Sequence, residues 1–220
     1  MPLDVRAIDE ALLRRLRAPG PDTFELALRA LRDDLEGFSD AELDRGVPLP
    51  PPLRRYAKLA GKIPTTNLHF HLPDEPRDGR LGFLHEEQGV FSVAATRDAE
   101  DPAVWLEDDG QWLREGERLS RFLLEYALYE VLVQTESAGM ARGGPGSLPR
   151  IVDVIPELPL ARWHHPGGML SFHAAIGGLA MMFHEPSGTQ ELWIAAEEDG
   201  AILRALEPLV HWSIPPWENR

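Results

Sequence analysis

Apolar side chains recur every three or four residues along the first 46 residues, which is the spacing of amphipathic helices. Asp4 is the expected N-cap of the first helix, and Pro19-Gly20-Pro21 ends it. Asp22 with Glu25 has the spacing of a capping box before a second helix. We therefore predict an N-terminal helical layer, whose apolar stripes are Ile8, Leu12 and Leu16, followed by Phe24, Leu28, Leu31 and Leu35.

Two further helix starts follow. Ser39 with Glu42 repeats the capping-box spacing, and Gly46 can close that short helix. The run Pro48–Pro52 has two interpretations, because a PxxP spacing suits a polyproline ligand and proline also favours the first turn of a helix. Apolar residues at helical spacing continue from Leu53 to Leu59 before Gly61, which favours helix initiation.

Short apolar runs divided by turn residues replace this pattern from Leu81 to Arg114 and predict antiparallel strands. One hairpin is expected around Glu86–Gly89 and another around Asp109-Gly110, a strong hairpin signal. Helical spacing returns from Ser120 to Thr135, in a helix expected to pack on the sheet. Beyond it we predict a mobile, glycine-rich loop at 137–149, a third hairpin around Pro186–Gly188 and a short helix at Ala201–Leu206.

The predicted class is α+β, with a mostly antiparallel sheet of hairpins packed against helices. A chain of 220 residues can form one large core, and we expect the strands after residue 150 to extend the first sheet. The expected single domain comprises N-terminal helices at 1–46, a core at 47–136, the flexible loop at 137–149 and a β-rich extension at 150–220. No cysteine is present, which excludes disulfides and thiolate metal sites and favours a cytoplasmic protein. Charges within Met1–Leu16 argue against a signal peptide, and the longest apolar stretch is too short to span a bilayer.

The net charge of −14 argues against nucleic acid or an anionic membrane as a partner. More than half of it lies between Asp74 and Glu117, a segment with thirteen acidic residues and no lysine. Two interpretations remain open, an ordinary solvated face and a patch that steers a basic protein partner. The candidate partner-binding residues of that patch are Glu86, Glu87, Asp98, Glu100, Asp101, Glu107, Asp108 and Asp109.

The catalytic motifs are incomplete. His85-Glu86-Glu87-Gln88-Gly89 begins like a zinc-protease helix but has Gly89 in place of the second histidine. His69 and His71 would share one face of a strand, and His164-His165 could join them at a metal, but adjacent histidines on a strand face opposite ways. His173 and His184 lie in apolar runs, where a hydrogen-bonded histidine is the usual outcome. We expect neither a metal, nor a cofactor, nor catalysis.

Six tryptophans offer aromatic anchors, and most of them are expected in the core. Trp212 and Trp217 are the exceptions, because Pro215-Pro216 interrupts regular structure between them near the end of the chain. They are the candidate anchors for a regulatory partner.

The order of several short motifs resembles the Smi1/Knr4 (SUKH) superfamily. These are Leu49-Pro50-Pro51-Pro52-Leu53 before a helix ending at Gly61, Glu86–Phe91, Asp101–Val104 and Leu119–Leu123, and together they cover about residues 40–135. The resemblance implies an α+β fold and a bacterial immunity protein that binds and neutralises a polymorphic toxin, often a nuclease or deaminase. The expected function is thus non-catalytic occlusion of a basic toxin domain. The alternatives are a regulatory or scaffold protein with a host partner and, third, a metal-dependent enzyme.

Overall fold

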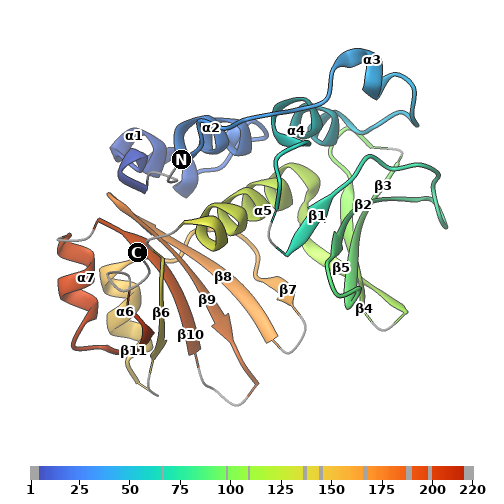
Figure 1. Ribbon diagram of the computed structural model, residues 1–220. Coiled ribbons are helices and arrows are strands. Elements are labelled where there is room, and N and C mark those ends of the chain that lie inside the picture. Colours follow the sequence, from blue (N-terminus) through green and yellow to red (C-terminus); the bar gives the residue numbers. More distant parts are fainter. Residues whose placement is uncertain are drawn as a thin grey trace. The chain divides into compact units, whose positions relative to one another are not determined.

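The computed structural model describes residues 5–65, 67–97, 99–108, 110–135, 138–143, 146–165, 168–186, 190–197 and 200–215. It shows an α+β chain with two antiparallel sheets (Figure 1). The chain divides into two compact units. The first-sheet unit comprises Gly20–Arg29 and Asp34–Ala127, and the second-sheet unit comprises Met1–Pro19, Ala30–Asp33 and Leu128–Arg220.

The first-sheet unit holds a five-stranded sheet in which each strand pairs with the next along the chain. Its strands are β1 (Leu68–Phe70), β2 (Arg80–Glu86), β3 (Phe91–Thr96), β4 (Ala103–Asp108) and β5 (Gln111–Arg118). The helices α3 (Asp40–Leu43) and α4 (Pro51–Ala60) belong to this unit, whereas α2 (Thr23–Leu31) and α5 (Leu119–Gln134) each have residues in both units.

One face of the first sheet is buried. Leu81, Val93 and Leu106 are at most 1% exposed, and the ring of Phe83 meets that of Phe122 on α5 edge to face at 6.1 Å. The hydroxyl of Tyr126 on α5 donates a hydrogen bond of 2.8 Å to the Leu68 carbonyl oxygen. The predicted helix therefore packs on the predicted sheet, and its apolar contacts leave the opposite sheet face for other roles.

The hairpin predictions are confirmed. β2 pairs with β3 and β4 pairs with β5, and Gly89 and Gly110 in the two connections both have φ of +74°. A third tight turn was missed. Asp78 and Gly79 both have positive φ, and the backbones of Arg77 and Arg80 exchange hydrogen bonds of 2.9 Å across this turn, so it resembles a type I′ turn.

Two of the predicted helix starts are confirmed. Ser39 and Glu42 form a complete capping box, and α4 begins at Pro51, as helix initiation predicted for the proline run. Glu25, which has capping-box spacing from Asp22 in the sequence, makes an ion pair of 2.7 Å with Arg55. The N-cap of α1 (Glu10–Arg17) is Asp9, which lies closer to the helix than the predicted Asp4.

The second-sheet unit holds a six-stranded sheet with the order β11-β6-β10-β9-β8-β7. It also contains the 3-10 turn η1 (Val5–Ala7), α1, α6 (Leu148–Val154) and α7 (Ala201–Leu206), the last with its predicted bounds. Its strands are β6 (Gly139–Gly143), β7 (Trp163–His165), β8 (Gly168–Ala175), β9 (Gly178–His184), β10 (Gln190–Ala196) and β11 (Val210–Ile214). The third predicted hairpin, β9 with β10, is confirmed.

Two expectations about this half are wrong. The strands after residue 150 do not extend the first sheet but form the second one. The segment expected to be a mobile loop contains β6, which pairs with both β10 and β11, and the start of α6. Hydrogen bonds to strands on both sides hold this glycine-rich segment as a strand, and the local composition could not predict them.

None of the described helices is long and apolar enough to cross a membrane.

Candidate functional site

The face of the first sheet opposite α5 carries polar and aromatic side chains. The strand register places His69 opposite His85, His85 opposite Ser92, Ser92 opposite Glu107 and Glu107 opposite Trp112. Residues directly opposite each other in a sheet project from the same face. One row of five side chains thus crosses the whole sheet on its outer face.

Small side chains hollow the middle of this face. Gly82, Ser92 and Ala94 lie at the base of a cleft of about 570 Å³. His71 and His85 line one side, and Glu107 and Trp112 line another. The segment from Asp74 to Arg77 and the side chain of Arg80 complete the lining. A hollow of this volume has room for a few amino-acid side chains.

Arg80 is held by the aromatic side chains of this face. Its guanidinium carbon lies 4.4 Å from the ring centre of Trp105 and 5.1 Å from that of Trp112. The Asp78-Gly79 turn places Arg80 at the start of β2. Trp105 and Trp112 were expected in the core, but both are only half-buried. Trp105 lies two residues before Glu107 on β4, and Trp112 lies opposite Glu107 on β5, so both tryptophans share the outer face with it.

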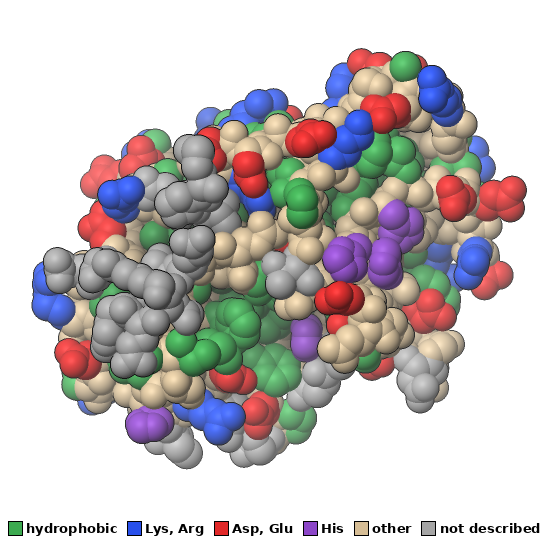
Figure 2. All heavy atoms as spheres, in the orientation of Figure 1, with side chains coloured by type: hydrophobic (Ala, Val, Ile, Leu, Met, Phe, Trp, Pro, Cys, Tyr) green, Lys and Arg blue, Asp and Glu red, His purple; other side chains and the backbone are tan. Residues whose placement is uncertain are grey.

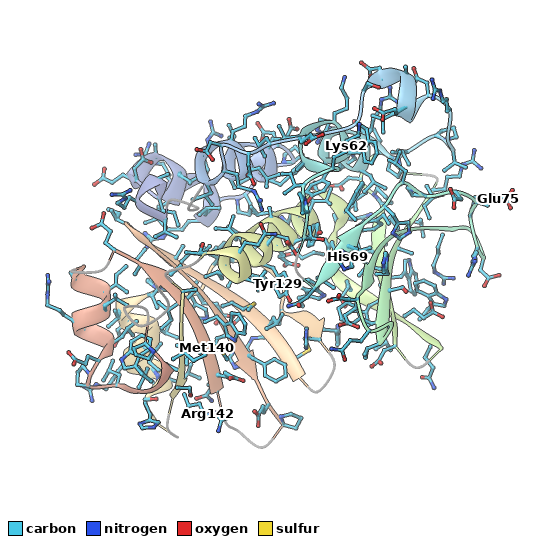
Figure 3. All side chains as sticks on the ribbon, in the orientation of Figure 1. Lys62, His69, Glu75, Tyr129, Met140 and Arg142 are labelled. Carbon is cyan, nitrogen blue, oxygen red and sulfur yellow. The ribbon has the colours of Figure 1, made fainter. Side chains whose placement is uncertain are left out.

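Three histidines gather beside the cleft. The Nδ1 atoms of His71 and His85 are 3.2 Å apart, and the ring centres of His69 and His85 are 5.4 Å apart. Figure 2 shows histidine side chains together on the surface, and Figure 3 labels His69 on β1. Sequence reasoning paired His69 with His71 but missed His85, since the register that brings it opposite His69 is not local.

The electrostatic setting of His71 favours its neutral form. Burial lowers the pKa of His71 and the neighbouring His85 lowers it further, whereas the His69 backbone and Asp74 act in the opposite direction. A contact between two Nδ1 atoms requires one ring to donate and the other to accept. In the described part of the chain, no group of three or more histidine, aspartate or glutamate side chains could hold a metal ion.

A second hollow of about 480 Å³ adjoins the cleft between the tips of the two hairpins. It is lined by Gly89–Ser92, Glu107, Asp108 and Gly110, so Ser92 and Glu107 belong to both hollows. We call the cleft and this hollow together the outer-sheet groove. The groove follows β3 and β4 and ends among the hairpin tips.

The predicted acidic patch is divided by the strand order. Successive connections of an antiparallel sheet lie at alternate ends, so Glu86, Glu87 and Asp108 lie at one end and Glu100 and Asp101 at the other. Glu107 lies between them in the groove. Asp98 and Asp109 lie outside the described residues.

Two of the predicted residues already have structural partners. Glu86 accepts hydrogen bonds from the backbone N–H groups of Gln88 and Val90, at 2.9 and 3.2 Å, and so closes its own turn. Asp101 accepts hydrogen bonds of 2.9 and 2.7 Å from the backbone N–H and hydroxyl of Ser120, which caps the first turn of α5. The remaining described candidates in the groove or at its end are Glu87, Glu107 and Asp108.

The candidate aromatic anchors and remaining histidines lie elsewhere. Trp212 packs against the apolar core of the second-sheet unit, and Trp217 lies outside the described residues. His164 and His165 lie on β7, in a different unit from His69 and His71. His173 is hydrogen-bonded to the Ile155 carbonyl oxygen at 3.1 Å and to the Ser171 hydroxyl at 2.9 Å, which confirms the interior role expected for it.

Comparisons with protein-family models, with the sequences of curated proteins and with solved structures find no match to this chain. The resemblance to the Smi1/Knr4 superfamily therefore stays a prediction carried by the motifs themselves.

Proposed function

We propose that this chain is a non-catalytic binding protein that holds a basic segment of another protein in the outer-sheet groove. The observation that carries the proposal is Glu107. Its half-buried carboxylate lies in both hollows of the groove and has no ion-pair partner among the described residues. A cationic side chain from a partner would pair with this carboxylate, since a charge-assisted hydrogen bond is stronger than a neutral one.

Shape and charge support an extended occupant. The groove follows two strands over small side chains, and it opens at the hairpin tips beside Asp108 and Glu87. Negative charge at its mouth would speed the encounter with a basic partner, in a manner that salt weakens. Trp112 adds an aromatic surface of the kind that dominates binding energy at protein interfaces.

The biological form of this proposal is an immunity-like protein. A nuclease binds phosphate through positive charge, so an acidic protein that covers that surface blocks the enzyme without any reaction of its own. A cytoplasmic location and a toxin partner belong to the same proposal. The motif resemblance supports this form. The packing of Trp212 against the apolar core argues against the regulatory alternative, because Trp212 is one of the two anchors proposed for a host partner.

Affinity capture from the native organism at low and moderate salt tests the proposal. The bait is the tagged chain, compared with a Glu107→Gln, Asp108→Asn double variant and with a Glu100→Gln control at the other end of the sheet. We expect a basic protein with nuclease or deaminase activity to be captured and inhibited by the wild type and the control, and lost from the double variant. Equal capture by all three baits would contradict the role of the groove.

A further inference from the structure

The histidines of the first sheet lie where they can control the charge of the groove. His71 and His85 both line the cleft, and the ring of His69 on the neighbouring strand packs against that of His85 at a tilt of 42°. His69 itself hydrogen-bonds through Nδ1 to the Thr65 hydroxyl at 3.2 Å. Of the three rings, those of His71 and His85 are the ones that both touch each other and line the binding site.

The charged groups around these rings are nearly balanced. The cleft lining has three carboxylates, from Asp74, Glu75 and Glu107, and two guanidinium groups, from Arg77 and Arg80. With neutral imidazoles the cleft has one negative charge in excess. Protonation of His71 and His85 would leave one positive charge in excess, so the sign of the cleft reverses. Asp108 lies beyond the cleft, at the hairpin end of the groove.

Protonation of both rings also breaks the contact between them. The 3.2 Å separation of the Nδ1 atoms requires one of them to accept a hydrogen bond. A doubly protonated pair has two donors and two like charges at that distance, so the rings must separate. Burial and the neighbouring His85 lower the pKa of His71 below the ordinary histidine value near 6.5, so the change of charge requires an acidic pH.

We propose that protonation of His71 and His85 expels a basic segment from the outer-sheet groove, so that acidification switches binding off. This inference rests on the proposed function of the groove. A partner held by Glu107 at neutral pH would meet two new positive charges, of which that on His85 lies two strands away from Glu107, at roughly 10 Å. Repulsion at such distances corresponds to a loss of affinity of about tenfold or more.

Binding of a fluorescein-labelled hexa-arginine peptide, measured by fluorescence anisotropy at low salt, tests the inference. Arginine keeps its charge throughout, so the probe itself does not titrate. The measurement compares pH 7.5 with pH 5.5 in the wild type and in a His71→Gln, His85→Gln double variant, whose side chains stay neutral. The matched control is His211→Gln, an exposed histidine on β11 of the other unit.

We expect the Kd of the wild type and of the control to rise at least about tenfold at pH 5.5, and that of the double variant to change by less than about threefold. The same pH dependence in all three proteins would overturn the inference. Saturable binding by the wild type at pH 7.5 that does not weaken at pH 5.5 would overturn the inference and leave the proposed function standing. An absence of binding by the wild type at pH 7.5 would overturn both.

Discussion

The guanidinium carbon of Arg80 lies 4.4 Å from the ring centre of Trp105, and this contact anchors one wall of the outer-sheet groove. Trp112 contacts the same guanidinium at 5.1 Å, so the arginine bridges two neighbouring strands. Arg80 also begins β2 directly after the Asp78-Gly79 turn. A turn, a charged side chain and two tryptophans thus fix the geometry of the site together.

Replacing Arg80 by alanine should destabilise the chain by about 1 kcal/mol, because the cation–π contacts with the two indoles are lost. Arg80→Lys should recover only part of this stability, since an ammonium group cannot stack as a planar guanidinium does. Urea unfolding followed by tryptophan fluorescence measures both effects. Arg77→Ala, at an exposed position of the same turn, serves as the control. Equal stability of Arg80→Ala and the control would show that the stack contributes nothing.

Asp101 should behave as a helix cap and not as a binding residue. Asp101→Ala removes the acceptor for the backbone N–H and the hydroxyl of Ser120, which should cost about 1 kcal/mol in the free energy of unfolding. Asp101→Asn keeps an acceptor and should cost less. Both variants should bind the hexa-arginine peptide as the wild type does. A loss of binding without a loss of stability would indicate that Asp101 contacts the partner and does not act mainly as a helix cap.

Glu125 is a buried carboxyl on α5 whose Oε1 atom has no hydrogen-bond partner within the described residues. Burial raises its pKa well above the ordinary value, and Glu117 and Glu115 add to this effect against Arg121. The folded chain therefore keeps Glu125 protonated where the unfolded chain ionises it, so its contribution to stability is present below about pH 4.5 and is lost as pH rises.

Glu125→Gln removes this titration while keeping the shape of the side chain. We expect the difference in Tm between the variant and the wild type to shift in favour of the variant from pH 5 to pH 8. Calorimetry at both values measures it, with Glu100→Gln as an exposed control. A constant difference across this range would mean that the Glu125 carboxyl ionises as readily in the folded chain as in the unfolded one.

His173 should make the second-sheet unit sensitive to acid. Its Nδ1 faces the Ile155 carbonyl oxygen, so Nδ1 carries the proton and Nε2 accepts from the Ser171 hydroxyl. Burial is the main cause that lowers the pKa of His173. It also lowers the pKa of His184, whose Nε2 lies 2.8 Å from the same hydroxyl. A lowered folded-state pKa means that stability is lost as pH falls below the ordinary value near 6.5.

The free energy of unfolding of the wild type should therefore decrease between pH 7 and pH 5, with a smaller decrease in His173→Gln. Ser171→Ala, which leaves His173 without its donor, should cost about 1 to 2 kcal/mol at pH 7. Chemical denaturation at both pH values gives these quantities. Equal pH slopes in the wild type and in His173→Gln would contradict the assignment of His173 as the acid-sensitive group.

Local sequence motifs predicted most of the helices and strands. The elements that were missed depend on pairing between residues far apart in the chain. The Ser39–Glu42 capping box, the Asp109-Gly110 connection and the helix at Ala201–Leu206 depend on neighbouring residues, and they were found. Strand β6 depends on β10 and β11, which lie far along the chain, so its glycine-rich composition indicated a loop.

The same distinction holds at the site. Counting carboxylates could not show that Glu100 and Asp108 lie at opposite ends of the sheet, because this follows from the alternation of the connections. Nor could it show that Glu86 and Asp101 serve backbone groups. Glu107 and Asp108 were predicted, whereas His85 and the pair Trp105 and Trp112 emerge only from the register of strands.

The most direct test of the account is an NMR titration of the chain with unlabelled hexa-arginine peptide at pH 7.5 and low salt, following the indole N–H signals of Trp105 and Trp112 and the backbone of β3 and β4. We predict saturable shifts confined to the outer-sheet groove, abolished by Glu107→Gln and retained in Glu100→Gln. Shifts centred on the β3–β4 connection around Glu100 and Asp101, or unaltered shifts in Glu107→Gln, would contradict the groove as the binding site.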